Sequence, residues 1–406
     1  MNHFITKIHI EKLFHLGKID ILVSDTEMKH LLITGKNGSG KTLLLNAISL
    51  FLEKAVSNPS FMRTKENFKN YTLRLEKAEK EKNIDNLNTY NNGLKYISKT
   101  YDETFAKVEL FFADYYSIYK SFEDDDFFYA FYEAHRKSEM KEPLNPTKPN
   151  LSKSKSIKKT ATDQFLNFLL DLKIKEALAR NEKLFDEADV IKKWFENFQE
   201  LLSEIYDDPK LELKFNYQDY SFHICTDEKS FKFVELSDGY TAIIEIVADL
   251  ILKMQREGGT VSSNFNKFGI VLIDEIETHL HLSLQRNILP FLTRVFPNVQ
   301  FIVTTHSPFV LNSLKNVVAY DLENNKRIED LSEYSYETLT TGYFKVETES
   351  SYLKIKLEKY ISLCEKKELS VSEKAERDLL FKELEAIPHA ISPKIVGKFE
   401  TFNLMN

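Results

Sequence analysis

The chain has 406 residues, 42% of them hydrophobic, and its 55 Lys and Arg against 62 Asp and Glu give a formal charge of −7 and a pI near 5.9. The hydrophobic content supplies the core of one large domain or of a domain with a substantial insertion. The net negative charge excludes a surface that is basic throughout, but it is compatible with a local basic groove that binds nucleic acid. Cys225 and Cys364 form no CxxC pair, which argues against a disulfide framework or a zinc site. No apolar run approaches the roughly 20 residues that span a bilayer, so we expect a cytoplasmic protein with no membrane segment.

The first third of the chain predicts strands around one buried helix. Strand alternation occurs over residues 4–10, 19–23, 30–34 and 106–112. The apolar stretch 43–52 predicts a helix buried against a sheet. Residues 62–92 are rich in Lys, Glu and Asn, and we interpret them as an exposed helix and a loop.

The middle of the chain changes composition. Residues 142–160 carry three prolines and then alternating Ser and Lys, which is typical of a linker, and residues 162–206 have a helical period. Further strands are predicted over 211–216, 220–225 and 230–235, and a helix over 241–255. Two continuous runs rich in β-branched residues, 268–273 and 299–304, predict strands buried on both faces. Beyond Tyr320 the pattern is charged and helical.

The firmest motif is the run Gly35-Lys36-Asn37-Gly38-Ser39-Gly40-Lys41-Thr42. It satisfies G-x-x-x-x-G-K-[ST] between a predicted strand and a predicted helix, the context of a P-loop. The glycines let backbone N–H groups surround a phosphate. Lys41 would neutralise charge on the β- and γ-phosphates, and Thr42 would offer its hydroxyl to a metal ion. The run therefore predicts a site for ATP and Mg²⁺.

Two acids and a histidine follow the two buried strands. Asp274 and Glu275 come directly after the run 268–273; Asp274 would hold Mg²⁺, and Glu275 would act as general base on the attacking water. Two acids after a strand are as often a solvated turn as a functional site. Because this pair follows a P-loop in the chain, a functional site is favoured. His306 follows the next strand, where its imidazole would bond the γ-phosphate or the water.

A shorter motif precedes the predicted helix 241–255. In Leu236-Ser237-Asp238-Gly239-Tyr240, Ser237 is placed to cap the helix. A plain cap explains Ser237 and Asp238, but it does not explain Gly239, which costs roughly 1 kcal/mol in a first helical turn. A helix N-terminus with a bare backbone would receive a γ-phosphate well.

Together these motifs resemble the ABC-type ATPases of the SMC, RecF and OLD group. Gly35 to Thr42 matches their Walker A motif, Ser237, Asp238 and Gly239 their signature, Asp274 and Glu275 their Walker B motif, and His306 their switch histidine. The runs 274–281 and 305–310 look especially like the OLD-like ATPases of prokaryotic antiphage defence, similar to the ATPase subunits of PARIS or Septu systems. The resemblance implies an α/β P-loop fold of the ABC-ATPase type, with a mixed sheet, flanking helices, a helical insertion and a helical C-terminal tail.

The resemblance also implies a division of the chain. We expect an N-terminal ATPase lobe with Walker A over residues 1–135, a linker over 136–160 and a helical insertion over 161–209. A C-terminal lobe with the signature, Walker B and the switch histidine would cover 210–320, and a helical tail 321–406.

The sequence departs from the family at several points. Asp238 stands where transporter-type ATPases usually carry Gly, and residues 107–120 offer no Q-loop glutamine. The insertion, about 45 residues without a sustained heptad, excludes an arm of SMC length. The tail lacks the clustered acids of a Toprim nuclease.

In this family the signature of one subunit completes the ATP site of another, so the resemblance implies a homodimer or a higher homo-oligomer. Our first hypothesis is an ATPase, converting ATP and water to ADP and phosphate, that acts as a sensor and scaffold switch in antiphage defence. It would respond to a phage-derived trigger and control a separately encoded effector such as a Toprim or HNH nuclease. The alternative is a RecF- or SMC-like DNA-binding ATPase of DNA repair, which salt-dependent duplex binding would favour. A transporter's nucleotide-binding subunit fits least, because such subunits are shorter.

Overall fold

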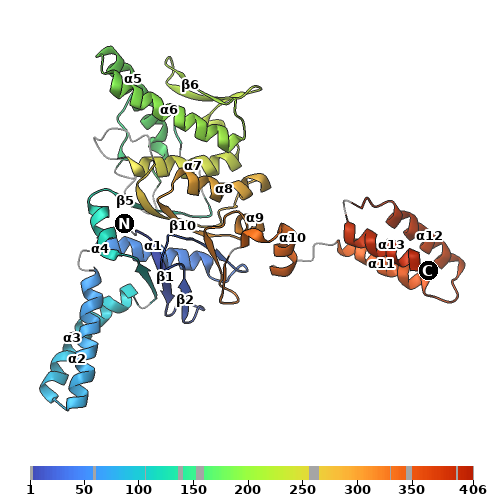
Figure 1. The fold of residues 1–406 in the computed structure, drawn as a ribbon, viewed down its shortest axis with the longest axis horizontal. Coiled ribbons are helices and arrows are strands. Elements are labelled where there is room, and N and C mark those ends of the chain that lie inside the picture. Colours follow the sequence, from blue (N-terminus) through green and yellow to red (C-terminus); the bar gives the residue numbers. More distant parts are fainter. Residues whose placement is uncertain are drawn as a thin grey trace. The chain divides into compact units, whose positions relative to one another are not determined.

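The computed structural model describes residues 3–57, 61–105, 107–135, 140–151, 160–255, 265–329, 331–343, 350–389 and 392–405 (Figure 1). The chain forms two compact units, Met1–Glu333 and Tyr334–Asn406, and each is described by itself. Among the described residues, no helix is long and apolar enough to cross a membrane.

A six-stranded sheet forms the centre of the first unit. Its strands lie in the order β12 (Lys326–Glu329), β11 (Val317–Asp321), β3 (His30–Thr34), β10 (Val299–Thr304), β9 (Phe268–Ile273) and β5 (Phe127–Tyr132). All neighbours are parallel except β12, which pairs antiparallel with β11. The carboxyl ends of five parallel strands therefore meet at one edge, where loops position functional side chains in such sheets.

Helices cover both faces of this sheet. Successive side chains of a strand point to opposite faces, and α1 (Lys41–Ser57) packs into one core cluster with Leu31, Ile33, Ile270 and Leu272. Figure 1 shows α7 (Asp238–Met254) and α8 (Leu282–Val295) on the other side of the sheet. The predicted α/β class, a mixed sheet with flanking helices, is confirmed.

A second, antiparallel sheet packs against the first. It has the order β2 (Ile19–Leu22), β1 (Ile5–Ile10) and β4 (Val108–Phe112), as the strand alternation predicts. Gln300 of β10 ties it to the central sheet, because its amide accepts from the Ile5 nitrogen at 2.8 Å and donates to the Ile5 carbonyl at 3.0 Å. Ala106, which the predicted strand included, lies outside the described residues.

Between α1 and β4 the chain forms a helical hairpin. The prediction of one helix and a loop over 62–92 is wrong, because α2 (Phe61–Glu81) and α3 (Ile84–Phe105) are both helices. Aromatic side chains spaced through this polar stretch pair the two helices, with the rings of Phe68 and Tyr101 stacked at 3.8 Å. A short helix, α4 (Tyr115–Glu123), then leads to β5.

The predicted helical insertion is present as a helix pair with a small sheet. It contains α5 (Phe165–Asn181) and α6 (Phe185–Tyr206), followed by β6 (Glu212–Asn216), β7 (Ser221–Cys225) and β8 (Ser230–Lys232). The last predicted strand, 230–235, ends early in a short 3₁₀ turn. The Leu213 nitrogen donates to Gln199 Oε1 of α6 at 2.9 Å, so the sheet packs with the insertion although the predicted boundary at 209 separates them. Of the predicted linker, residues 152–159 lie outside the described residues.

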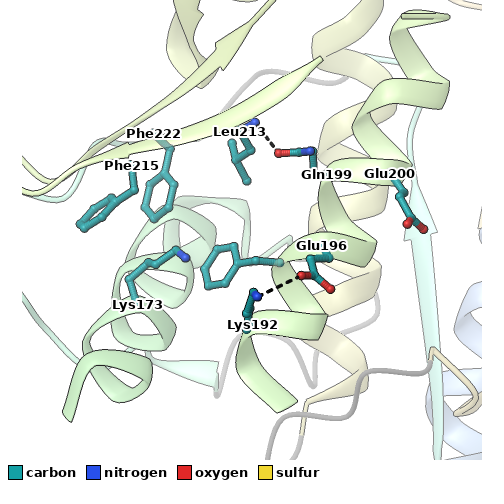
Figure 2. A pocket seen from close by; sticks show the side chains of 9 residues that line it. Lys173, Lys192, Glu196, Gln199, Glu200, Leu213, Phe215 and Phe222 are labelled. Atoms are coloured by element: carbon teal, nitrogen blue, oxygen red, sulfur yellow. Dashed lines mark hydrogen bonds and ion pairs between the residues drawn. The ribbon is translucent and has the colours of Figure 1, made fainter. Parts of the chain in front are cut away.

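A hollow of about 400 Å³ lies between this small sheet and α5 and α6 (Figure 2). Phe222 comes from the sheet, and Lys173, Lys192 and Glu196 come from the helices. Lys173 lies 3.9 Å from the ring centroid of Phe195, and Lys192 pairs with Glu196 at 3.7 Å. The two lysines of the hollow therefore already have partners within the insertion.

The predicted boundary at residue 320 cuts the central sheet, because β11 continues to Asp321 and β12 follows it. The second compact unit begins at Tyr334 and contains α10 (Tyr336–Thr338), α11 (Ser351–Cys364), α12 (Val371–Glu385) and α13 (Pro393–Met405). Tyr360, Leu384 and Phe399 contribute to its own apolar core. The predicted helical character of this part is confirmed.

Candidate functional site

The loop after β3 is built from glycines in a left-handed conformation. Gly35, Gly38 and Gly40 have φ angles of 137°, 82° and 98°, which residues with a Cβ atom rarely adopt. A Cβ on Gly35 would lie 3.3 Å from the backbone nitrogen of Glu323, whereas one on Gly38 would meet nothing within 4 Å. The buried hydroxyl of Ser39 has no hydrogen-bond partner among the described residues. The loop is therefore a backbone cradle at the N-terminus of α1, with an unused hydroxyl and space for an anion.

Lys41 begins α1 and folds back over this loop. Its Nζ donates to the carbonyl oxygens of Gly35 at 3.0 Å and Lys36 at 3.2 Å. Burial lowers the pKa of Lys41, and the carboxylates of Glu275 and Asp274 oppose this shift. The ammonium group thus lies between the loop and the acids that follow β9, as a cation that contacts a bound phosphate must.

Hydrogen bonds join the end of β9 to the P-loop helix. Thr42 Oγ1 donates to Asp274 Oδ2 at 2.8 Å, and Thr304 Oγ1 donates to Asp274 Oδ1 at 2.6 Å. The Glu275 nitrogen donates to the same Thr304 hydroxyl at 2.7 Å. Hydroxyl and carboxylate oxygens are ligands that suit Mg²⁺, and here Thr42 and Asp274 already lie in contact. The residues present therefore fit a magnesium ion at this edge.

Glu275 has a strained backbone. Its φ of 44° is unusual for a residue with a side chain, and such strain tends to persist where the surrounding structure fixes it. The bond from its nitrogen to Thr304 and a 3.4 Å bond from the Thr278 hydroxyl to its Oε2 supply part of that restraint.

His306 follows β10 at the same edge. Its backbone nitrogen donates to Glu277 Oε1 at 2.5 Å, while its buried Nε2 has no hydrogen-bond partner among the described residues. Burial, and then the charge of Lys41, lower the pKa of His306 from 6.5, and the nearby carboxylates oppose them. The imidazole is therefore neutral at pH 7, with one ring nitrogen available to a ligand.

The signature segment lies at the start of α7, on the other side of the sheet from α1 (Figure 1). Ser237 occupies the N-cap position, but the expectation that its side chain caps the helix is wrong, because that side chain makes no capping hydrogen bond. Packing within the chain explains why residue 239 is a glycine, because a Cβ there would lie 3.0 Å from the carbonyl oxygen of His279. The loop after Glu275 and the first turn of α7 are thus in close contact.

The structure therefore brings Lys41, Thr42, Asp274, Glu275 and His306 together at one sheet edge and places Ser237, Asp238 and Gly239 on a separate helix. Sequence reasoning missed Thr304, which bonds both acids, and Glu277, which holds the His306 backbone. It also missed Glu323, whose carboxylate pairs with Lys36 at 2.7 Å. Each missed residue ends or follows a parallel strand of the sheet, so it reaches the site through the order of the strands, and no motif spacing in the sequence pointed to it.

Three comparisons with known proteins bear on this site. The chain is 38% identical over 100 residues to the Retron Ec83 probable ATPase of Escherichia coli, a stretch that is 25% of this chain and 18% of that protein. It is 43% identical over 97 residues to the Septu protein PtuA of Bacillus mycoides, which is 24% of this chain and 13% of that protein. The match spans less than a fifth of either relative. The SMC head domain from Thermotoga maritima has 14% identity and a TM-score of 0.36, over 78% of this chain and 94% of that one.

One family model matches far more of the chain. It covers residues 31–312, from β3 to α9 (Pro308–Leu311), and so includes every residue from Gly35 to His306 that the site contains. The predicted similarity to the ATPase of a Septu system is confirmed by the relatives above. Because the matched stretch is well over half of the sequence, the chain belongs to the family described as "AAA domain, putative AbiEii toxin, Type IV TA system".

Proposed function

We propose that this chain binds ATP with Mg²⁺ at the carboxyl edge of the central sheet and hydrolyses it. The observation that carries the proposal is the meeting at that edge of a glycine cradle, a lysine, a hydroxyl–carboxylate pair and an imidazole nitrogen that has no hydrogen-bond partner among the described residues. Three segments widely separated in sequence, 35–42, the end of β9 and the end of β10, supply these groups. Within the described part of the chain Ser39 Oγ and His306 Nε2 are buried without a hydrogen-bond partner, and such atoms are costly unless a ligand uses them.

The cradle from Gly35 to Gly40, including Lys36, Asn37 and Ser39, would hold the phosphates through its backbone. Lys41 would exchange its two carbonyl partners for phosphate oxygens, a gain because both new partners carry charge. Thr42 and Asp274 would hold Mg²⁺, which when bound would neutralise negative charge on the phosphates.

Glu275 would take a proton from the water that attacks the γ-phosphate, and the bond to the leaving ADP would break as the new P–O bond forms. The hydrogen bond from the Glu275 nitrogen to Thr304, whose hydroxyl also bonds Asp274, fixes the positions of the two acids relative to each other. His306, neutral at pH 7, would donate or accept a hydrogen bond through Nε2 without adding charge.

We further propose that two copies share each ATP. Ser237, Asp238 and Gly239 start a 17-residue helix whose N-terminal amides can receive an anion, yet Gly239 lies against the loop after Glu275 of its own chain. In a homodimer the signature of one copy would face the ATP of the other and respond to hydrolysis through that loop.

The biological role we propose is that of an ATP-driven switch in antiphage defence. The family membership and the similarity to a Septu protein support this role. A separately encoded effector, such as a Toprim or HNH nuclease, would be the partner, and a phage-derived component the trigger. Co-purification of a nuclease encoded beside this gene would support the role, and a phage challenge with no protection by the gene pair would contradict it.

The ATPase proposal is tested with Lys41→Ala and Glu275→Gln. Lys41→Ala should lose ATP binding in calorimetry, whereas Glu275→Gln should bind ATP, stop releasing phosphate and accumulate an ATP-bound dimer in light scattering. Lys54→Ala, at the last turn of the same helix, is the matched control and should behave as the wild type. Unchanged ATP affinity in Lys41→Ala, or normal phosphate release in Glu275→Gln, would refute the assigned roles.

A further inference from the structure

A chain of hydrogen bonds, buried at its insertion end, connects the insertion to the acids of the site. At one end, the backbone nitrogen of Ala161, the residue before the first turn of the insertion, donates to Asp249 Oδ1 at 2.7 Å. The Tyr132 hydroxyl donates to Asp249 Oδ2, also at 2.7 Å. The Asp274 nitrogen donates to the Tyr132 carbonyl at 2.8 Å, and Asp274 accepts from Thr42 at 2.8 Å. Four consecutive bonds thus run from the insertion to the P-loop helix.

Asp249 occupies the junction of this chain. It lies on α7, the helix that starts with the signature, and it is fully buried. Its third neighbour is Lys253, one turn further on, at 3.5 Å and also buried. A buried carboxylate is tolerated only when hydrogen bonds and an opposite charge compensate its lost hydration, so Asp249 resists any movement that breaks these bonds.

The insertion also touches the signature end of α7. The ring of Tyr206, at the end of α6, stacks on the ring of Tyr240 with 4.2 Å between centroids and 13° between planes. Arg294 of α8 pairs with Glu204 beside this contact. The insertion is therefore attached to α7 near both ends of that helix, at Tyr240 and at Asp249.

From this geometry we infer that Tyr132 and Asp249 are positioning residues that couple the ATP site to the helical insertion. The inference rests on the proposed function. When the edge of the sheet reorganises around ATP and Mg²⁺, the Asp274 backbone moves Tyr132, and Tyr132 passes that movement through Asp249 to Ala161 and α7. In the reverse direction, anything that binds the insertion changes how Asp274 is held, because coupling between two sites is reciprocal.

The chain contains its own probe for this coupling. Trp194 is its single tryptophan, and it is fully buried in the insertion. Its ring contacts Phe168, Phe195 and Phe198 at centroid distances of 5.6, 5.2 and 5.4 Å. In the folded protein, tryptophan emission therefore reports on the packing around Trp194 in the insertion.

The test compares Tyr132→Phe with Tyr129→Phe in the full-length protein. Both changes remove one buried hydroxyl from β5, but Tyr129 belongs to the opposite face of the sheet, in the cluster under α1. We expect ATP with Mg²⁺ to change Trp194 emission in the wild type and in Tyr129→Phe, and to leave it unchanged in Tyr132→Phe. Calorimetry should show that Tyr132→Phe still binds ATP but needs about fivefold more Mg²⁺, since Asp274 is less well placed.

The outcomes separate the inference from the proposed function. A wild type that binds no ATP overturns both. A wild type that binds ATP without any change in emission, or a Tyr132→Phe variant that responds and takes up Mg²⁺ as the wild type does, overturns the coupling alone. If Tyr132→Phe does not fold, Asp249→Asn replaces it, because an amide offers one acceptor where two are needed and must break one of the two bonds.

Discussion

The hydroxyl of Thr304 makes two buried hydrogen bonds that a single substitution removes without changing the shape of the side chain. Thr304 is fully buried; it donates to the Asp274 carboxylate and accepts from the Glu275 nitrogen. Thr304→Val keeps the branched outline but leaves a buried carboxylate oxygen and a buried N–H without this partner. We therefore expect a loss of stability and displacement of both acids.

The size of the effect follows from the two bonds. A hydrogen bond to a charged acceptor contributes about 1.5–3 kcal/mol and one between neutral groups about 0.5–1.5 kcal/mol, while the new methyl group returns about 0.8 kcal/mol. Thr304→Val should lower the free energy of unfolding by about 1–4 kcal/mol. Urea unfolding followed by Trp194 emission measures this, because both residues lie in the unit Met1–Glu333.

Thr34 provides a matched control. It ends the neighbouring strand β3 and is also fully buried, but its hydroxyl has no hydrogen-bond partner among the described residues. Thr34→Val should leave the free energy of unfolding unchanged or raise it, since a buried hydroxyl without a partner is itself unfavourable. Equal unfolding midpoints for Thr304→Val and Thr34→Val would refute the reasoning.

Two other substitutions test the packing and the pH response of the sheet. Alanine normally stabilises a helix by about 1 kcal/mol relative to glycine. In Gly239→Ala, however, the new Cβ would lie 3.0 Å from the His279 carbonyl oxygen. We therefore expect no increase in the urea midpoint and a loss of the ATP-dependent dimer in light scattering. A stabilised variant that still dimerises would contradict this. Burial lowers the pKa of His30 from 6.5 to about 4, and its Nδ1 accepts from the Phe301 nitrogen at 3.1 Å. The folded state favours neutral His30, so the contribution of His30 to the free energy of unfolding is fully present above pH 6.5. About 3 kcal/mol of that free energy is lost as the pH falls towards 4. His30→Gln should not show this loss, and a difference between wild type and variant that stays constant from pH 7 to 4.5 would be inconsistent with it.

The sequence predicted the central part of the fold because its signals are continuous and local. The run that became β9 is apolar throughout, and the run that became β10 contains only Gln300 before its terminal Thr304. The glycines before α1 favour positive φ angles, which the structure contains. The hairpin of α2 and α3 was missed because its apolar side chains are sparse in a polar stretch, so the second helix gave no clear period. Its stability comes from ring contacts between helices, such as Phe68 with Tyr101, which a single-helix pattern does not contain.

The site residues divide in the same way. Motif spacing identified Lys41, Asp274 and His306 as candidates, but no spacing rule pointed to Thr304 or Tyr132. Their contacts with the acids depend on the order of the parallel strands, which places the ends of β10 and β5 on either side of the end of β9. Strand order is a property of tertiary pairing, so a single sequence carries no direct signal for it.

The position of β3 between β10 and β11 has a consequence during protein synthesis. The glycine loop is synthesised before the strands on both sides of β3, which begin at Val299 and Val317. Roughly 270 residues must therefore follow β3 before the sheet can close, and at 5–20 residues per second this takes on the order of 15–55 s. During that interval a strand that is buried along its whole length in the finished protein has no sheet neighbour. A nascent chain of this kind should depend on ribosome-associated chaperones, and it gains a complete nucleotide site only after β10 and β11 have been synthesised.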